Sequence, residues 1–240
     1  MNSRINSKKV SALRTIRGAS EAHDQGVRTR TLRGMNEQSN KEASQGWKFL
    51  VGVDEAGRGP LAGPVAVGIA CVPQNFDWKL IPGVGDSKKV SPKNREAIFR
   101  TAVKLKKAGV ITYAVTLVSA STIDRIGITG AVKLGIERGF KKLALNPKQT
   151  VVKLDGLLKA PAEFLNQETI IKGDAKEKVI GLASILAKVT RDRTMVRIAR
   201  DYPEYDFEIH KGYGTQKHRD IMTKYGLTPI HRRSFCNKFL

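Results

Sequence analysis

The 240-residue chain has little cysteine: it contains only Cys71 and Cys236, which lie far apart in the sequence. Two such distant cysteines exclude a disulfide framework and match no metal-binding spacing. Cys71 lies in an apolar run, where we expect it to be buried as a small hydrophobic side chain. Because chains without structural disulfides are typical of reducing compartments, we expect a cytoplasmic protein.

Long apolar runs are also missing. The longest one, Val65–Val72, is far shorter than the roughly 20 residues with which a helix crosses a bilayer. The N-terminus is basic but has no apolar segment behind it, so it does not have the pattern of a secretory signal. We therefore expect no association with a membrane.

Acidic residues are scarce relative to basic ones. The chain has 43 Lys and Arg against 22 Asp and Glu, which gives a net charge of +21 at pH 7. Such an excess opposes folding by self-repulsion but suits a polyanionic partner, and nucleic acid is the commonest one. A ribosome-like binder and a merely soluble basic protein are the alternatives at this point.

Residues 1–46 differ from the rest because they contain no aromatic side chain and few large apolar ones. Nine Lys and Arg and four Asp and Glu give this segment a net charge of nine minus four, or +5. The composition predicts a basic, disordered N-terminal extension, or an artefact of start assignment, since Met35 also offers a start. Residues 47–240 have the composition of one folded domain.

Hydrophobic periodicity in residues 47–240 predicts strands that alternate with helices. Phe49–Val53 and Pro64–Val72 are joined by a glycine-rich turn too short for a helix, so we expect neighbouring antiparallel strands. The other elements expected are strands at Ile111–Val118, Thr150–Leu154 and Glu168–Lys172, and helices at 92–107, Ser121–Leu145, Asp174 to about Arg200, and Thr215–Tyr225. The helix from Asp174 has an apolar stripe made of Val179, Leu182, Leu186, Val189 and Val196. This order predicts a mixed α/β sheet with helices packed on it.

Two adjacent carboxylates, Asp54 and Glu55, follow the first predicted strand and precede the turn Gly57-Arg58-Gly59. Neighbouring side chains on a strand point to opposite faces, so both acids can serve one site only if the strand ends there. Acids beside exposed N–H groups and one arginine are suited to hold cations and a phosphodiester together. The alternative is a pair of solvated acids at a strand end.

The same turn fits the dinucleotide-binding pattern G-x-G-x-x-A over residues 57–62. That pattern requires a helix to open at the turn, whereas strand character resumes here at Pro64. The acids before the turn would also repel a pyrophosphate. We therefore reject a nicotinamide-binding function.

Two further carboxylates are placed at the ends of predicted elements. Asp155 follows a strand and precedes Gly156, which is also the pattern of a plain Asp-Gly turn. Asp174 opens a predicted helix with Glu177 three residues later, a capping-box arrangement that can also aim a carboxylate into a cleft. Oxygen donors without Cys or His favour Mg²⁺ or Mn²⁺ over zinc, and two such ions support phosphodiester cleavage.

Tyr213 lies between two glycines, in the segment His210–Thr215. A tyrosine in that setting is easily exposed and is suited to stack on a base or sugar, although a simple loop tyrosine has the same pattern. Several basic residues are suited to hold phosphates, and each is equally typical of a solvated face: Lys88, Lys89, Lys188, Arg191, Arg193, His231, Arg232 and Arg233.

Together these motifs resemble those of the ribonuclease HII family. The segments that carry the resemblance are Gly52–Pro64, Asp86–Lys89, Lys172–Asp174, Ala183–Arg193, His210–Thr215 and Pro229–Phe235. They are long, occur in a fixed order and cover most of the chain beyond the extension. The resemblance implies an RNase H-like fold, which is a mixed sheet flanked by helices, with a small helical C-terminal part.

The resemblance also implies an activity: cleavage of the RNA strand of RNA–DNA hybrids and of the 5′ side of ribonucleotides embedded in duplex DNA, leaving 3′-hydroxyl and 5′-phosphate ends. By match to the family's motifs, two divalent ions, Mn²⁺ or Mg²⁺, would bind Asp54, Glu55, Asp155 and Asp174. The substrate would contact Gly57, Arg58, Gly59, Lys89 and Tyr213. In this set the glycine turn would read the 2′-hydroxyl, and the tyrosine would stack at the junction with the following deoxynucleotide.

We expect this enzyme to be a monomer that serves DNA replication and repair. Two alternatives stay open on the sequence. One is a basic nucleic-acid-binding protein without catalysis, which explains the charge and needs none of the acids. The other is a different RNase H-fold nuclease, such as a resolvase, which would keep the metal ions and lose the preference for ribose.

Overall fold

The computed structural model describes residues 46–85 and 90–237. Residues 1–45 of the predicted extension, and Lys88 and Lys89, lie outside the described residues. Five strands form one sheet in the order β3-β2-β1-β4-β5. Their bounds are β1 (Phe49–Ala56), β2 (Val65–Pro73), β3 (Thr112–Val118), β4 (Thr150–Asp155) and β5 (Gln167–Ile170). The predicted strands are confirmed, with β1 extended beyond Val53.

The sheet is mixed, as predicted. Strands β1 and β2 are antiparallel, with Asp54 opposite Gly68 and Glu55 opposite Val67. Strand β3 adds to β2 in the antiparallel sense, whereas β4 pairs with β1, and β5 with β4, in the parallel sense. Parallel pairing of β1 with β4 brings the carboxyl ends of these two strands to the same edge of the sheet.

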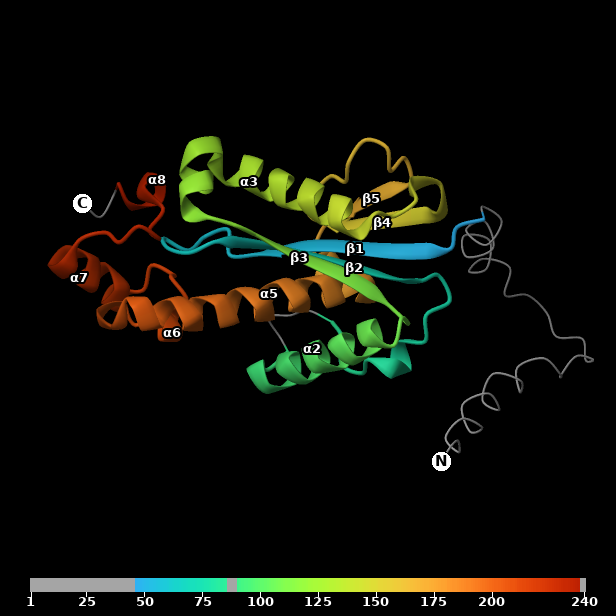
Figure 1. Cartoon of the computed structure of the whole chain (residues 1–240), viewed down its shortest axis with the longest axis horizontal. Helices are drawn as coiled ribbons and strands as arrows, with labels where there is room; N and C mark the ends of the chain where they lie inside the picture. The colour runs from blue at the N-terminus through green and yellow to red at the C-terminus, as the bar shows by residue number, and fades with distance from the viewer. Residues whose placement is uncertain (1–45, 86–89, 238–240) are drawn as a thin grey trace, which may run out of the picture. The chain divides into compact units, whose positions relative to one another are not determined.

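Helices cover both faces of the sheet (Figure 1). Helix α3 (Ala120–Leu143) lies over one face, and helices α2 (Pro92–Lys107) and α5 (Lys178–Ile198) lie over the other. Side chains of β2 alternate between the two cores, so that Val67 packs on the α3 side and Val72 on the α5 side. A strand buried on both faces is apolar throughout, which explains the unbroken apolar run of β2.

Helix α5 packs directly on β1 and β2 because a glycine occupies the contact. A Cβ atom built on Gly68 would lie 2.2 Å from the carbonyl oxygen of Ala183. No side chain fits in that space, so the backbone of α5 contacts the sheet. This close approach places the residue after Ala183, Ser184, beside the end of β1.

The helix predicted from Asp174 is interrupted. Gly173–Lys176 form the short helix α4, Glu177 is extended with φ −117° and ψ 115°, and α5 begins at the next residue. The predicted capping box is wrong, because the N-cap of α4 is Lys172 and not Asp174, and the Glu177 side chain accepts a hydrogen bond from the Lys153 Nζ at 2.8 Å. The predicted apolar stripe is also incomplete, since Val196 is 42% exposed.

The helices predicted at 92–107, Ser121–Leu145 and Thr215–Tyr225 are confirmed, with small shifts of their ends. Helix α3 is kinked at Gly127, where φ is 72°, in the glycine-rich stretch that weakens its helical pattern. The C-terminal part consists of α6 (Phe207–His210), α7 (Gln216–Tyr225) and α8 (Arg233–Cys236), which lie together at one end of the sheet (Figure 1). Within the described ranges, no helix has the length and apolar character needed to cross a bilayer.

Candidate active site

Asp54 and Glu55 lie on β1 and point to opposite faces of the sheet. The expectation that the strand ends at these acids is wrong for its pairing with β2, which continues to Ala56, whereas its pairing with β4 does end before them, at Val53. Asp54 faces α5, where the Ser184 hydroxyl donates a hydrogen bond to it. Glu55 faces α3 and lines a cavity there.

Asp155 lies at the same edge of the sheet, and its charge acts on both Asp54 and Glu55. Pairing of β1 with β4 ends at Val53 and Leu154, so that the next residues, Asp54 and Asp155, lie side by side where the two strands separate. The negative charge of Asp155 acts on both Asp54 and Glu55 and raises the pKa of each. An acid at the open edge of the sheet therefore interacts with acids that point to either face.

Burial is the largest influence on the pKa of Asp54 and on that of Glu55. It raises the pKa of Asp54 to about 8, although the hydrogen bond from Ser184 lowers it, and the charges of Glu55 and Asp155 raise it further. Burial also raises the pKa of Glu55, and the guanidinium of Arg58 opposes this effect. Acids shifted in this direction lack enough positive charge around them to favour their ionised form.

Asp174 follows Gly173, whose backbone is hydrogen-bonded to Asp155. The backbone N–H of Gly173 donates to Asp155 Oδ1 at 2.7 Å, and Asp174 is the following residue in α4. This bond fixes the beginning of α4 against the end of β4. It explains why α4, which contains Asp174, begins near the strand ends although 18 positions separate Gly173 from Asp155.

The acids fit a hard cation in chemistry, although they are not gathered into a ligand shell. Among the residues that the structure describes, no group of three or more His, Cys, Asp and Glu side chains is placed to hold a metal ion. The Glu55 Oε2, however, is buried and has no hydrogen-bond partner among them. A buried carboxylate oxygen without a partner is costly, and a divalent cation is a suitable partner for it.

The glycine turn is held from behind by a buried arginine. Arg232, which is 0% exposed, donates to the carbonyls of Gly57 at 2.7 Å, Arg58 at 2.8 Å and Gly63 at 3.0 Å. The turn needs glycine at position 57, because φ is 94° there and a Cβ atom would lie 2.1 Å from the Nε of Arg191. The backbone of the turn is therefore fixed by a fork of three hydrogen bonds.

A second buried arginine supports the same turn. Arg191 is 0% exposed and donates to the carbonyls of Pro64 at 2.8 Å and Ala62 at 3.2 Å. The two arginines, and also His231 at 2% exposed, are therefore not the surface phosphate ligands, nor the solvated face, that their sequence positions suggest. Their positive charges lie directly beneath the backbone of the turn.

Tyr213 lies beside this turn. The carbonyl of Gly212 accepts hydrogen bonds from the N–H groups of Leu61 at 2.8 Å and Ala62 at 3.2 Å. The Tyr213 ring is 41% exposed, and the Arg191 guanidinium lies 5.8 Å from its centroid. The structure thus brings together two motifs that are about 150 residues apart in the sequence.

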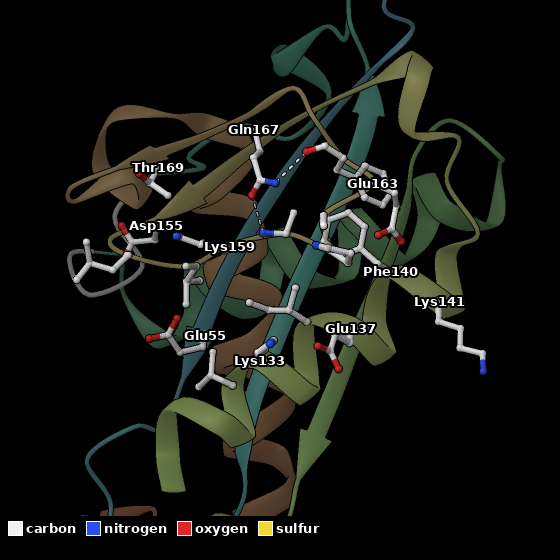
Figure 2. Close-up of a pocket in the computed structure, with 18 of the residues that line it drawn as sticks. Glu55, Lys133, Glu137, Phe140, Lys141, Asp155, Lys159, Glu163, Gln167 and Thr169 are labelled. Carbon is white, nitrogen blue, oxygen red and sulfur yellow. Dashed lines mark hydrogen bonds between the residues drawn. The ribbon is translucent and has the colours of Figure 1, made fainter. Parts of the chain in front are cut away.

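A cavity of about 1600 Å³ opens beside Glu55 and Asp155, between α3 and the segment that joins β4 to β5 (Figure 2). Gln167 stabilises this segment, because its side chain donates to the Phe164 carbonyl at 2.9 Å and accepts from the Ala160 N–H at 2.8 Å. The sequence does not predict this cavity, because its lining comes from separate segments. It gives access to the acids from the α3 side of the sheet.

The family model of Ribonuclease HII matches residues 51–238. The ribonuclease HII of Caldicellulosiruptor bescii is 45% identical over 200 residues, which cover 83% of this chain and 92% of that protein. The chain belongs to the ribonuclease HII family. The resemblance seen in the motifs is confirmed.

Solved structures agree with this assignment. The crystal structure of the ribonuclease H2 from Pyrococcus horikoshii OT3 matches with a TM-score of 0.60 and 28% identity over 80% of this chain and 96% of that one. The crystal structure of Bst-RNase HIII in complex with Mn²⁺ matches with a TM-score of 0.58, over 93% of this chain and 74% of that one. Its 19% identity shows the fold alone.

As a member of the ribonuclease HII family, the protein is a ribonuclease H, a hydrolase that acts on RNA in RNA–DNA hybrids. The predicted RNase H-like fold is confirmed. Nucleic-acid binding without catalysis, the first alternative, is not favoured.

The sequence does not reveal the roles of three residues that shape this ribonuclease HII site: it does not single out Ser184, and it suggests Arg191 and Arg232 as phosphate ligands. Ser184 bonds Asp54, and Arg191 and Arg232 hold the turn. Each is a polar residue in a helix or turn that is otherwise buried, and such residues need partners. That mismatch is a signal in the sequence, but the partners of these residues are more than 100 positions away and cannot be read from it.

Proposed function

We propose that this ribonuclease HII family member hydrolyses the phosphodiester on the 5′ side of a ribonucleotide, leaving 3′-hydroxyl and 5′-phosphate ends. Its substrates are RNA–DNA hybrids and duplex DNA that contains single ribonucleotides. Two divalent ions, Mg²⁺ or Mn²⁺, are held by Asp54, Glu55, Asp155 and Asp174. When bound, such ions lower the pKa of a water molecule and stabilise negative charge on the departing 3′-oxygen.

One observation carries this proposal: Asp54 and Asp155 directly follow the last paired residues of β1 and β4, and Asp155 lines one cavity together with Glu55. The raised pKa values of Asp54 and Glu55, and a Glu55 Oε2 that has no partner among the described residues, are also what a cation site would show without its cation. The donors are oxygen atoms, which Mg²⁺ and Mn²⁺ prefer. The Mn²⁺ in the crystal structure of Bst-RNase HIII, a protein with the same fold, is consistent with this choice.

The glycine turn offers backbone hydrogen-bond donors to the 2′-hydroxyl. In a trans peptide the N–H points opposite to the C=O, and none of the described peptide bonds is cis. Because Arg232 binds the carbonyls of Gly57 and Arg58, the N–H groups of Arg58 and Gly59 point away from the buried guanidinium. Two outward N–H donors are suited to bind the 2′-oxygen, which distinguishes RNA from DNA.

Tyr213 offers an aromatic ring for stacking beside the glycine turn. Its ring is partly exposed, and the bonds between Gly212 and residues 61 and 62 keep it beside the turn. A ring in this place is suited to stack on the sugar or base that follows the ribonucleotide. Lys89 is outside the described residues, so its contact with substrate stays a prediction from the sequence.

The experiment that tests the acids uses wild-type protein and the variants Asp54→Asn and Asp155→Asn. With Mg²⁺ or Mn²⁺, each variant is expected to cleave an RNA–DNA hybrid at least about 100-fold more slowly. Calorimetric titration with Mn²⁺ alone is expected to show weaker binding in both. Asp201→Asn, at an exposed acid away from these strands, is the control.

Either of two results would refute the metal role of the acids. One is full cleavage activity in Asp54→Asn, and the other is unchanged Mn²⁺ binding in both variants. Circular dichroism of each variant confirms that it is folded. A role in ribonucleotide removal during DNA replication and repair, in the cytoplasm and as a monomer, is part of the same proposal.

A further inference from the structure

Three buried histidines lie behind the Tyr213 segment. His210 ends α6, His218 lies in α7, and His231 precedes α8, and none is more than 8% exposed. The rings of His210 and His218 are stacked, with centroids 4.2 Å apart, and those of His218 and His231 are 5.2 Å apart. Helices α6, α7 and α8, which contain or closely follow these residues, lie together at one end of the sheet (Figure 1).

The hydrogen bonds determine where the proton lies on each ring. The N–H of Thr228 donates to His231 Nδ1 at 2.9 Å, so the proton of neutral His231 is on Nε2. That Nε2 lies 3.1 Å from His218 Nε2, so His231 donates and His218 accepts. The proton of neutral His218 is therefore on Nδ1, which lies 2.9 Å from the carbonyl oxygen of Tyr213.

His210 binds the residue that precedes Tyr213 in the chain. The N–H of Gly212 donates to His210 Nδ1 at 3.1 Å, which places the His210 proton on Nε2, 2.7 Å from the carbonyl of Tyr205. All six ring nitrogens thus have a partner, and none is left for a metal ion. Burial also lowers the pKa of His218 and of His231 to about 4, which keeps both neutral at physiological pH.

We propose that His218 is a positioning residue, which acts with His231 behind it to fix the backbone of Tyr213 beside the glycine turn. The chain of donors runs from Thr228 through His231 and His218 to the carbonyl of Tyr213. His210 and the turn hold Gly212, the preceding residue, by its N–H and its carbonyl. These hydrogen bonds hold the backbone of Tyr213 and leave the residue 41% exposed.

This inference rests on the proposed contact of Tyr213 with substrate. If the ring stacks on the substrate, its effect depends on a fixed place relative to the acids, since a displacement of about 1 Å can cost roughly 100-fold in rate. His218 is suited to this task because it is a rigid ring. It reaches the Tyr213 carbonyl from a helix whose N-terminus is capped by Thr215, two residues after Tyr213.

The Tyr213 carbonyl also accepts from the Thr215 N–H at 2.8 Å. The test compares His218→Ala, which removes the side-chain donor and leaves that backbone donor, with His218→Asn, whose side-chain amide can place an N–H near the position of Nδ1. Each is made in the full chain with Tyr213 and with Tyr213→Ala, and cleavage at a single embedded ribonucleotide is measured with Mg²⁺. We expect His218→Ala to slow cleavage roughly tenfold, by less than the full cost of misplacement. We expect His218→Asn to restore most of that loss, and His218→Ala to have no further effect once Tyr213→Ala is present.

Two results would overturn the inference while the function of Tyr213 stands. In the first, Tyr213→Ala slows cleavage and His218→Ala does not. In the second, His218→Ala slows cleavage by the same factor whether or not the Tyr213 ring is there. If Tyr213→Ala itself has no effect on cleavage, the proposed stacking fails, and the positioning role fails with it.

A second measurement does not depend on the folding of any variant. Nitrogen-15 NMR of wild-type protein labelled at histidine reports which ring nitrogen carries the proton. We expect His218 protonated on Nδ1, and His210 and His231 protonated on Nε2, at neutral pH. Protonation of His218 on Nε2, or on both nitrogens, would break the chain of donors and overturn the proposal.

Discussion

Buried arginines that bind backbone carbonyls are the least expected residues of this protein. Among the residues that the structure describes, Arg191 and Arg232 donate to such carbonyls, and burial lowers the pKa of Arg232 to about 9, helped by the nearby charge of Arg191. Burying two like charges is costly, so their retention indicates a gain elsewhere. We attribute that gain to the fixed backbone of the glycine turn, whose N–H groups face the substrate.

Arg232→Lys tests this attribution at the scale of one residue. Lysine keeps the charge but loses the planar fork that reaches three carbonyls, so the free energy of unfolding is expected to fall by about 2 kcal/mol. Unfolding in urea measures the change. Arg233→Lys, at the exposed neighbour, is expected to stay within about 0.5 kcal/mol of wild type. Equal stability of the two variants would contradict the account of the turn.

The sequence points to candidate residues more readily than to their surroundings. Asp54, Glu55 and Asp155 stand out because acids at the end of a strand are candidates for a site, and their metal-binding role stays a prediction. The roles of Ser184 and Arg232 depend on partners distant in the sequence, and no local pattern names those partners. The same limit applies to His218, whose hydrogen bond to Tyr213 exists only because α6, α7 and the segment before α8 come together.

At the scale of elements, the packing of α5 on the sheet decides where the acids lie. Gly68 is opposite Asp54 on the neighbouring strand, and the helix backbone occupies the space that a side chain at position 68 would need. Helix α5 is buried on most of its surface for the same reason. The strand pattern predicts this sheet well, since its alternation and apolar runs are local features.

The break between α4 and α5 is a feature that the local sequence pattern does not predict. The spacing of Asp174 and Glu177 is that of a capping box, and it predicts one helix. In the structure Glu177 pairs with Lys153 on β4, and Gly173 donates to Asp155. These two long-range contacts override the local preference and fix the beginning of α4 beside the end of β4.

Gly68→Ala tests the packing of α5. The added methyl group would lie 2.2 Å from the backbone of α5, so helix and sheet must separate, and we expect a loss of more than about 2 kcal/mol in unfolding free energy. Gly59→Ala is the matched control, because a Cβ atom there meets nothing within 4 Å. Urea unfolding of both variants is the measurement. A stable Gly68→Ala protein would contradict the direct contact of backbone and sheet.

At the scale of the molecule, positive charge is the dominant property. The full chain has a net charge of +21, and removal of residues 1–45 leaves 21 − 5, or +16. The remaining charge is still large enough to attract nucleic acid strongly at low salt. The sequence thus predicts the class of partner from composition alone, whereas the place where that partner binds requires the fold.

Removal of residues 1–45 tests whether the rest of the chain is the catalytic unit. We expect the shortened protein to cleave an RNA–DNA hybrid within about threefold of the full chain, because the family match begins at residue 51. Steady-state rates of the two proteins at equal salt measure the difference. A loss of more than about tenfold, in a protein that is folded by circular dichroism, would make the extension part of the substrate site.

The most direct test of the whole account is a map of the cleavage site on duplex DNA that contains one ribonucleotide. The wild-type protein is incubated with Mg²⁺ or Mn²⁺, and an otherwise identical all-DNA duplex serves as the control. We predict one cut on the 5′ side of the ribonucleotide, with 3′-hydroxyl and 5′-phosphate ends and an intact control duplex. A cut elsewhere, equal cleavage of the all-DNA duplex, or no cleavage by folded protein would contradict it.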